Sequence, residues 1–92
     1  MPRVVVGPRA RRDVERAALW YARYRAGLDD EFVDAGAGTL AALAAGPERY
    51  AAAYRDLRRV SVDRFPYALT FRIRGDAVRV VACTHYRRDP RC

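Results

Sequence analysis

The hydrophobic period of this chain changes once along its length, and that change limits the folds it can adopt. Between residues 8 and 45 the apolar side chains recur at helical spacing, whereas from Arg55 onward they alternate with a period of two. Helices followed by successive strands favour an α+β fold, because a parallel sheet would need a crossover between its strands. The 92 residues suffice for one domain.

The first half predicts a short strand and two helices. Residues 3–6 are rich in valine, and Gly7-Pro8 ends this strand while placing proline in the first turn of a helix over 8–26. Gly27 stops that helix, and Asp29 or Asp30 is expected to cap a second one that continues to residue 45. Two glycines inside it, at 36 and 38, cost about 1 kcal/mol each relative to alanine, so we expect them where two helices of an antiparallel hairpin cross closely.

The second half predicts three strands in an antiparallel meander, over residues 57–62, 67–74 and 77–85. If Gly75-Asp76 is a two-residue turn, the last two strands pair in a fixed register. The expected core pairs are Ile73 with Val78, Phe71 with Val80, and Leu69 with Ala82. This face would receive the helices, and the opposite face would set Arg72 directly across from Arg79.

The positive charge is concentrated at the C-terminal end. Residues 55–92 carry ten arginines against four acidic residues, and so hold most of the formal net charge of +7. Arginine is the only strongly basic residue type in the chain, so genome composition explains part of the excess. The uneven distribution of acids is not explained in that way, and it favours an anionic partner for the sheet.

Cofactor and metal sites are not predicted. The two cysteines, Cys83 and Cys92, lack the spacing of a metal site and the density of a disulfide scaffold, so we expect free thiols in a reducing cytoplasm. A single histidine and scattered acids offer no ligand cluster. No apolar run approaches the roughly 20 residues that span a bilayer, so no membrane association is expected.

The ordered segments resemble the RelE/ParE superfamily of bacterial toxins, in its ParE-like (plasmid stabilisation) branch. The resemblance rests on the opening VVVGPRARRDVERAALWY, the break GPERY after the second helix, and the segments RRVSVDRFPYALTFRI and VRVVACTHYRRDP. It implies one toxin-like domain over residues 1–92, with an N-terminal strand, an antiparallel helical hairpin and a three-stranded antiparallel meander, the helices packed on one sheet face. It also implies the toxin of a type II toxin-antitoxin system, neutralised by an acidic antitoxin in a hetero-oligomer, with a homodimer as a further option.

Within that superfamily two branches differ in target. ParE-like members poison DNA gyrase, which implies growth inhibition by binding and no catalytic residues in this chain. The expected target-binding residues are then Arg72, Arg79, Arg87 and Arg88. An inactive, degenerate toxin is not distinguished from an active one by the sequence.

The alternative is a RelE-like or YoeB-like nuclease that cuts messenger RNA on the ribosome. His85 would act as general base or acid with help from Tyr86, while Arg64, together with Arg72 and Arg87, would hold the phosphate. The adjacent His85-Tyr86 pair resembles the C-terminal end of YoeB-like nucleases, whereas the following RRDP resembles the ParE-like end. The set of basic residues that RelE-like nucleases use is matched only in part.

A third hypothesis is a basic nucleic-acid-binding protein, which the charge allows. The chain shows no helix-turn-helix signature, zinc ligand set or RNA-binding aromatic motif on its strands. The helical spacing of Trp20, Tyr21 and Tyr24 predicts that they anchor the helical hairpin to the sheet or form a dimer contact. A base-stacking role would need these rings on an exposed platform.

Overall fold

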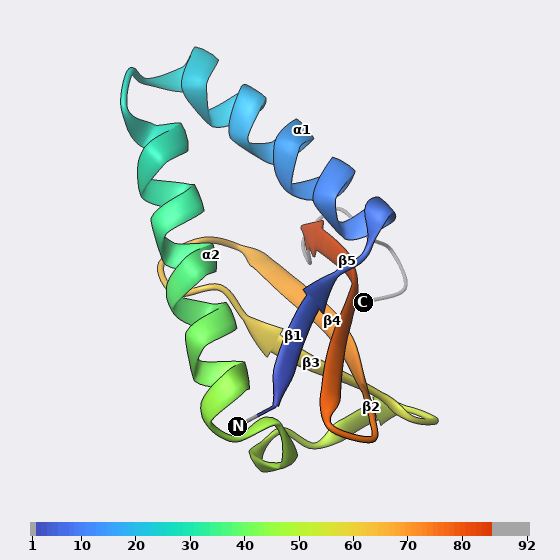
Figure 1. The fold of residues 1–92 in the computed structure, drawn as a ribbon. Helices are drawn as coiled ribbons and strands as arrows, with labels where there is room; N and C mark the ends of the chain where they lie inside the picture. Colours follow the sequence, from blue (N-terminus) through green and yellow to red (C-terminus); the bar gives the residue numbers. More distant parts are fainter. Residues whose placement is uncertain (1, 86–92) are drawn as a thin grey trace.

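The change of hydrophobic period is visible as two α-helices followed by strands (Figure 1). The computed structural model describes residues 2–85, and the predicted C-terminal site residues Tyr86, Arg87 and Arg88 therefore lie outside the described residues, as does Cys92. The described elements are β1 (Arg3–Val6), α1 (Pro8–Tyr24), α2 (Leu28–Ala45), the short 3-10 helix η1 (Pro47–Arg49), β2 (Ala52–Tyr54), β3 (Leu57–Ser61), β4 (Tyr67–Arg74) and β5 (Ala77–His85).

All the strands belong to one sheet in the order β1-β5-β4-β3-β2. The meander of β3, β4 and β5 is antiparallel, as predicted, and β1 pairs in parallel with β5. The α-helices form a hairpin against one sheet face (Figure 1), so the predicted α+β architecture is confirmed. Strand β2 and helix η1 were not predicted, because three residues each are too few for a period to be read from the sequence.

The link between β1 and α1 is fixed by the outer edge of β5. Strand β1 pairs only with residues 77–80, and the Gly7 N–H closes this ladder by donating to the Val80 carbonyl oxygen at 2.9 Å. Beyond that point the Cys83 N–H donates to Oδ2 of Asp13 on α1, at 3.0 Å. Because α1 replaces β1 as the partner of the β5 edge, the helix must cross the end of that strand.

The predicted register between β4 and β5 is correct near the turn and wrong beyond it. Ile73 pairs with Val78 and Phe71 with Val80, but Leu69 pairs with Cys83 instead of Ala82. Val81 is an extra residue in β5, and the register shifts between Thr70 and Phe71 to accommodate it. Such a β-bulge changes which residues of the bulged strand oppose its neighbour, and it leaves no trace in a period-two pattern.

The helix boundaries differ from prediction at the hairpin turn. Helix α1 ends at Tyr24, two residues early, and Gly27 caps α2 with a left-handed φ of 87°. Asp29 and Asp30 therefore lie in the first turn of α2, where their charge favours the helix dipole, and neither is the cap. Among the described helices none is long and apolar enough to cross a membrane.

The core lies between the hairpin and the sheet. Phe71, Val78 and Val80 of the sheet and Phe32 and Leu43 of α2 are its largest fully buried side chains. At the closed end of the hairpin an aromatic cluster surrounds Phe32, with ring centroids about 5 Å apart; its members are Tyr21, Phe32, Phe65 and Tyr67. This cluster fixes the hairpin against the start of β4.

The predicted reason for the α2 glycines is wrong. A Cβ built at Gly36 or Gly38 meets no heavy atom within 4 Å, so neither glycine marks a close helix crossing. The helices diverge from the turn that joins them (Figure 1), which leaves space beside α2.

We expect two glycine substitutions to change stability in opposite directions. Gly38→Ala should raise the free energy of unfolding by up to about 1 kcal/mol, because alanine is the better helix former and meets no neighbour. Gly75→Ala should lower it by about 1 kcal/mol, since Gly75 has a φ of 58° in the β4–β5 turn. Urea unfolding followed by circular dichroism would measure both, and a destabilised Gly38→Ala variant would contradict the open surroundings of that residue.

Candidate functional site

The outer face of the sheet, opposite the helices, carries a cluster of arginines. Arg72 and Arg79 are register partners, as predicted, and Arg74 lies two residues further along β4 on the same face. Asp56, in the turn between β2 and β3, accepts a contact of 2.9 Å from Arg74 and lies 4.0 Å from Nε of Arg72. We call these four residues the arginine face.

The charges of the arginine face are not balanced. Hydrogen bonding from Arg74, and then the positive charge of Arg72 and Arg74, hold the pKa of Asp56 below its usual 3.8. Nε of Arg72 is buried and has no hydrogen-bond partner among the residues that the structure describes. The Arg79 side chain lies beside Gly7, at the start of α1. Its Nη2 is 3.7 Å from the position that a Cβ would take at Gly7. The arginine face therefore holds three guanidinium groups and one carboxylate, and that carboxylate lies near Arg72 and Arg74.

A second candidate site is a hollow of about 460 Å³ between α1 and the ends of β4 and β5. His85 and Tyr67 lie on its sheet side, with ring centroids 5.0 Å apart in an edge-on arrangement. Its α1 side carries Arg9, Arg16, Trp20 and Arg23. We call it the basic hollow, because Asp13 is its one acidic lining residue in the described chain.

Asp13 and Cys83, the acid and the thiol of the basic hollow, have structural roles. Asp13 accepts the Cys83 N–H and lies 3.8 Å from Nε of Arg9. Burial, with a smaller contribution from the negative charge of Asp13, raises the pKa of Cys83 to about 12. Cys83 is therefore a protonated thiol at neutral pH and is not a nucleophile there.

The described structure does not bring the predicted nuclease residues together. Arg64 lies in the β3–β4 connection with a φ of 69°, above the ring of Phe65 and 3.7 Å from Glu31 of α2. It does not line the hollow that contains His85. Of the predicted nuclease residues that the structure describes, His85 alone lines that hollow.

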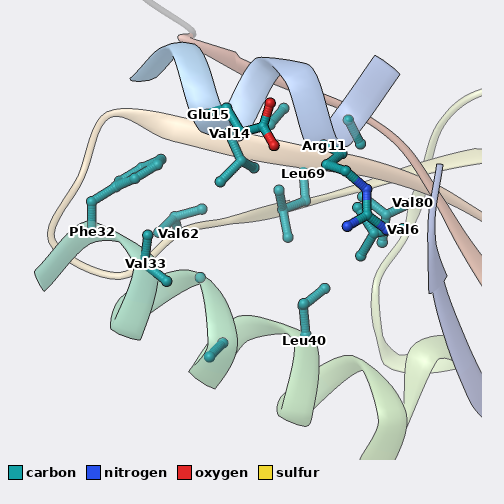
Figure 2. A pocket seen from close by; sticks show the side chains of 14 residues that line it. Val6, Arg11, Val14, Glu15, Phe32, Val33, Leu40, Val62, Leu69 and Val80 are labelled. Carbon is teal, nitrogen blue, oxygen red and sulfur yellow. The ribbon is translucent and has the colours of Figure 1, made fainter. Parts of the chain in front are cut away.

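A third candidate site is an apolar groove of about 290 Å³ between α1, α2 and the sheet. Figure 2 shows Phe32, Val33 and Leu40 reaching in from α2, with Val14 across from them on α1. Arg11 and Glu15 supply the charges of the lining, and Gly36 leaves a stretch of its α2 wall without a side chain. We call it the apolar groove.

Sequence reasoning missed the contribution of α1 to the basic hollow. Arg9, Arg16 and Arg23 recur every seven residues and so share one side of the helix, but this spacing does not show that the side faces the end of the sheet. Tyr21 anchors the hairpin, as predicted, but Trp20 and Tyr24 are 43% and 73% exposed, so they do not. Their alternative role, a dimer contact, stays a prediction. Exposure depends on where the sheet ends, which helical spacing does not show.

Comparison with known proteins gives a family and a fold. Residues 4–90 match the family model described as ParE toxin of type II toxin-antitoxin system, parDE. A solved structure described as the chromosomal ParDE TA system from P. aeruginosa matches with a TM-score of 0.82, over 92% of this chain and 96% of that chain. The two sequences are 15% identical, so this likeness concerns the fold. No curated protein matches the chain.

We expect the pKa of Asp56 to depend more on Arg74 than on Arg72. Arg74→Ala should move that pKa up towards 3.8 further than Arg72→Ala does, because the hydrogen bond from Arg74 is the largest cause of the shift. Folding lowers the pKa, so the charged form contributes stability above the unfolded-state pKa, which is lost as the pH falls through the folded-state pKa. Carbon-detected NMR titration would measure it, and a larger effect of Arg72→Ala would contradict the geometry.

Proposed function

Because the chain belongs to the ParE toxin family of type II toxin-antitoxin systems, within the RelE/ParE superfamily, we propose that it inhibits growth by binding an essential target. DNA gyrase in the cytoplasm is the proposed target, and residues 1–92 act as one toxin domain. The toxin performs no covalent chemistry of its own in this proposal. Its action depends on the stability of a complex.

The arginine face supports this proposal. Arg72 and Arg74 share the carboxylate of Asp56, Arg79 has no carboxylate partner among the described residues, and Nε of Arg72 is buried without a hydrogen bond from the described chain. A buried donor without an acceptor is unfavourable, and a carboxylate or phosphate on a partner would relieve it. Arg87 and Arg88, which follow β5, remain part of the proposed binding surface.

The neutralising partner is proposed to be an acidic antitoxin that uses a different surface. The apolar groove exposes Val33, which is 47% exposed on α2, beside the buried ring of Phe32. An amphipathic segment that folds into such a groove buries apolar side chains of both partners. The net charge of +7 attracts an acidic chain, which favours a toxin-antitoxin hetero-oligomer.

One observation favours the nuclease alternative. His85, a general base or acid candidate, shares the basic hollow with three arginines, and cleavage of RNA by its own 2′-hydroxyl needs cations near the phosphate. The separate position of Arg64 weakens this alternative, because its guanidinium is paired with Glu31. Ribosome-dependent mRNA cleavage is therefore the second candidate.

Substitutions in the arginine face and at His85 should distinguish gyrase inhibition from mRNA cleavage. We expect the double variant Arg72→Glu/Arg79→Glu to weaken inhibition of gyrase supercoiling about tenfold or more, since two contacts become repulsive. His85→Ala should stay within about threefold of wild type, whereas loss of a general acid-base group would cost about 10² to 10⁴ in rate. The measurements are supercoiling by purified gyrase and mapping of mRNA ends after induction.

The control for this pair is Arg12→Glu/Arg49→Glu, which changes the net charge equally at two exposed positions on α1 and η1 that are not part of the sheet. It should retain inhibition. mRNA cuts that appear on induction and vanish in His85→Ala would reject gyrase binding as the function and establish the nuclease.

The proposed antitoxin site in the apolar groove can be tested at Gly36, where the lining has no side chain. We expect Gly36→Phe to weaken antitoxin binding about tenfold or more, because the new ring occupies the groove and meets no atom of the toxin at its Cβ. Gly38→Phe is the matched control, since its Cβ is equally free but Gly38 lines no part of the groove. Growth rescue by the antitoxin encoded beside the toxin, and calorimetry, would measure binding; equal losses in both variants would contradict this location.

A further inference from the structure

We infer that the α1 side of the basic hollow, formed by Arg9, Arg16, Trp20 and Arg23, binds single-stranded nucleic acid. This surface is distinct from the arginine face and from the apolar groove. The inference does not depend on the identity of the toxin's essential target.

The three α1 arginines form a row along the helix, called the arginine ladder below, which is long enough to follow a nucleic-acid backbone. Residues seven apart on an α-helix lie nearly above one another and about 10 Å apart along its axis, so Arg9, Arg16 and Arg23 extend over about 20 Å. Arg9 lies near Asp13, whereas Arg16 and Arg23 form no ion pair with any residue in the described part of the chain. Two of the three guanidinium groups are therefore available to phosphates.

An aromatic platform lies on the same side of the helix. The rings of Trp20 and Tyr24 are stacked, with centroids 5.5 Å apart and an interplanar angle of 8°. Tyr24 is 73% exposed and Trp20 is 43% exposed, and Arg16 and Arg23 are one turn before and almost one turn after Trp20. Bases of any sequence stack on such exposed rings, and each stacked base contributes roughly 1–3 kcal/mol.

The sheet side closes the hollow with groups that suit a nucleotide. Thr84 and His85 bring a hydroxyl and an imidazole to the lining, and Tyr67 supplies the edge-on ring that holds His85. The volume of about 460 Å³ is in the range of about 300–1,000 Å³ found for small-molecule sites. An unpaired nucleotide has both the phosphate for the ladder and the flat base for the platform.

Charge and shape argue against the two other occupants. A second copy of this chain would place a like arginine ladder against this one, and its net charge of +7 makes that contact repulsive. An acidic peptide would pair with the arginines but offers no flat group to the parallel Trp20 and Tyr24 rings. A duplex would also pair with the arginines, but its bases are stacked on each other and are not free for the platform.

The experiment uses the whole 92-residue chain, made by cell-free synthesis. Because Trp20 is the only tryptophan, its fluorescence reports directly on stacking. The probes are a deoxythymidine and a uridine oligomer of about 12 nucleotides, a duplex of the same length, and poly-glutamate. We expect both single-stranded oligomers to quench Trp20, with affinity that falls as salt rises from about 50 to 200 mM.

Variants then locate the surface. Arg16→Glu/Arg23→Glu should weaken binding of the single-stranded oligomers about tenfold or more by fluorescence anisotropy, while the equally charged control Arg3→Glu/Arg55→Glu should lose less than about threefold. Tyr24→Ala, at an exposed position, should weaken single-stranded binding more than duplex binding. Circular dichroism of each variant would verify that it is folded.

Other outcomes would overturn the inference. Equal losses in the two double variants would show that net charge alone attracts the oligomer. Quenching by poly-glutamate as strong as by the oligomers would identify an acidic protein surface as the partner, and tighter binding of the duplex would exclude the platform.

A preference between the deoxythymidine and uridine oligomers would support the inference and tell which single-stranded nucleic acid the surface selects.

Discussion

The rest of the structure depends on how the backbone of β5 is hydrogen-bonded along the edge that faces away from β4. A nine-residue strand in the middle of a sheet needs a partner on both sides, and β1 is only four residues long. The remainder of that edge lies against α1, where the Asp13 carboxylate accepts the Cys83 N–H at 3.0 Å. Because buried backbone groups must be paired, this division of the edge decides where α1 crosses the sheet.

The position of α1 separates two surfaces of different character. One side of the helix, with Val14, borders the apolar groove, and the other side, with Arg16 and Trp20, borders the basic hollow. Cys83 lines both, so this part of β5 lies between them. A toxin built in this way can offer an apolar surface to one partner and a cationic surface to another at the same time, with the arginine face as a third surface beyond the sheet.

Much of the fold and part of the candidate sites were accessible from the sequence. The partnership of Arg72 with Arg79 followed from the Gly75-Asp76 turn, because a two-residue turn fixes the pairs beside it. The counter-charge of Asp56 did not follow, since it comes from the irregular turn before β3. Arg64 was grouped with His85 because RNA cleavage needs a cation near the phosphate, but the structure pairs it with Glu31 on α2. Local pattern predicts neighbours across a turn, and it does not predict contacts between separate elements.

The sequence by itself determined the two α-helices, the four longer strands and the family, because hydrophobic period, turn residues and charge are local properties of the chain. It also determined which residues of β4 and β5 share a face near their turn. Only the tertiary structure decided the bulge at Val81, the parallel partner of β5, and the alignment of the α1 arginines with the end of the sheet. These features depend on the lengths at which strands stop pairing and on packing between residues about 70 positions apart, as between Asp13 and Cys83. No local pattern encodes such distances.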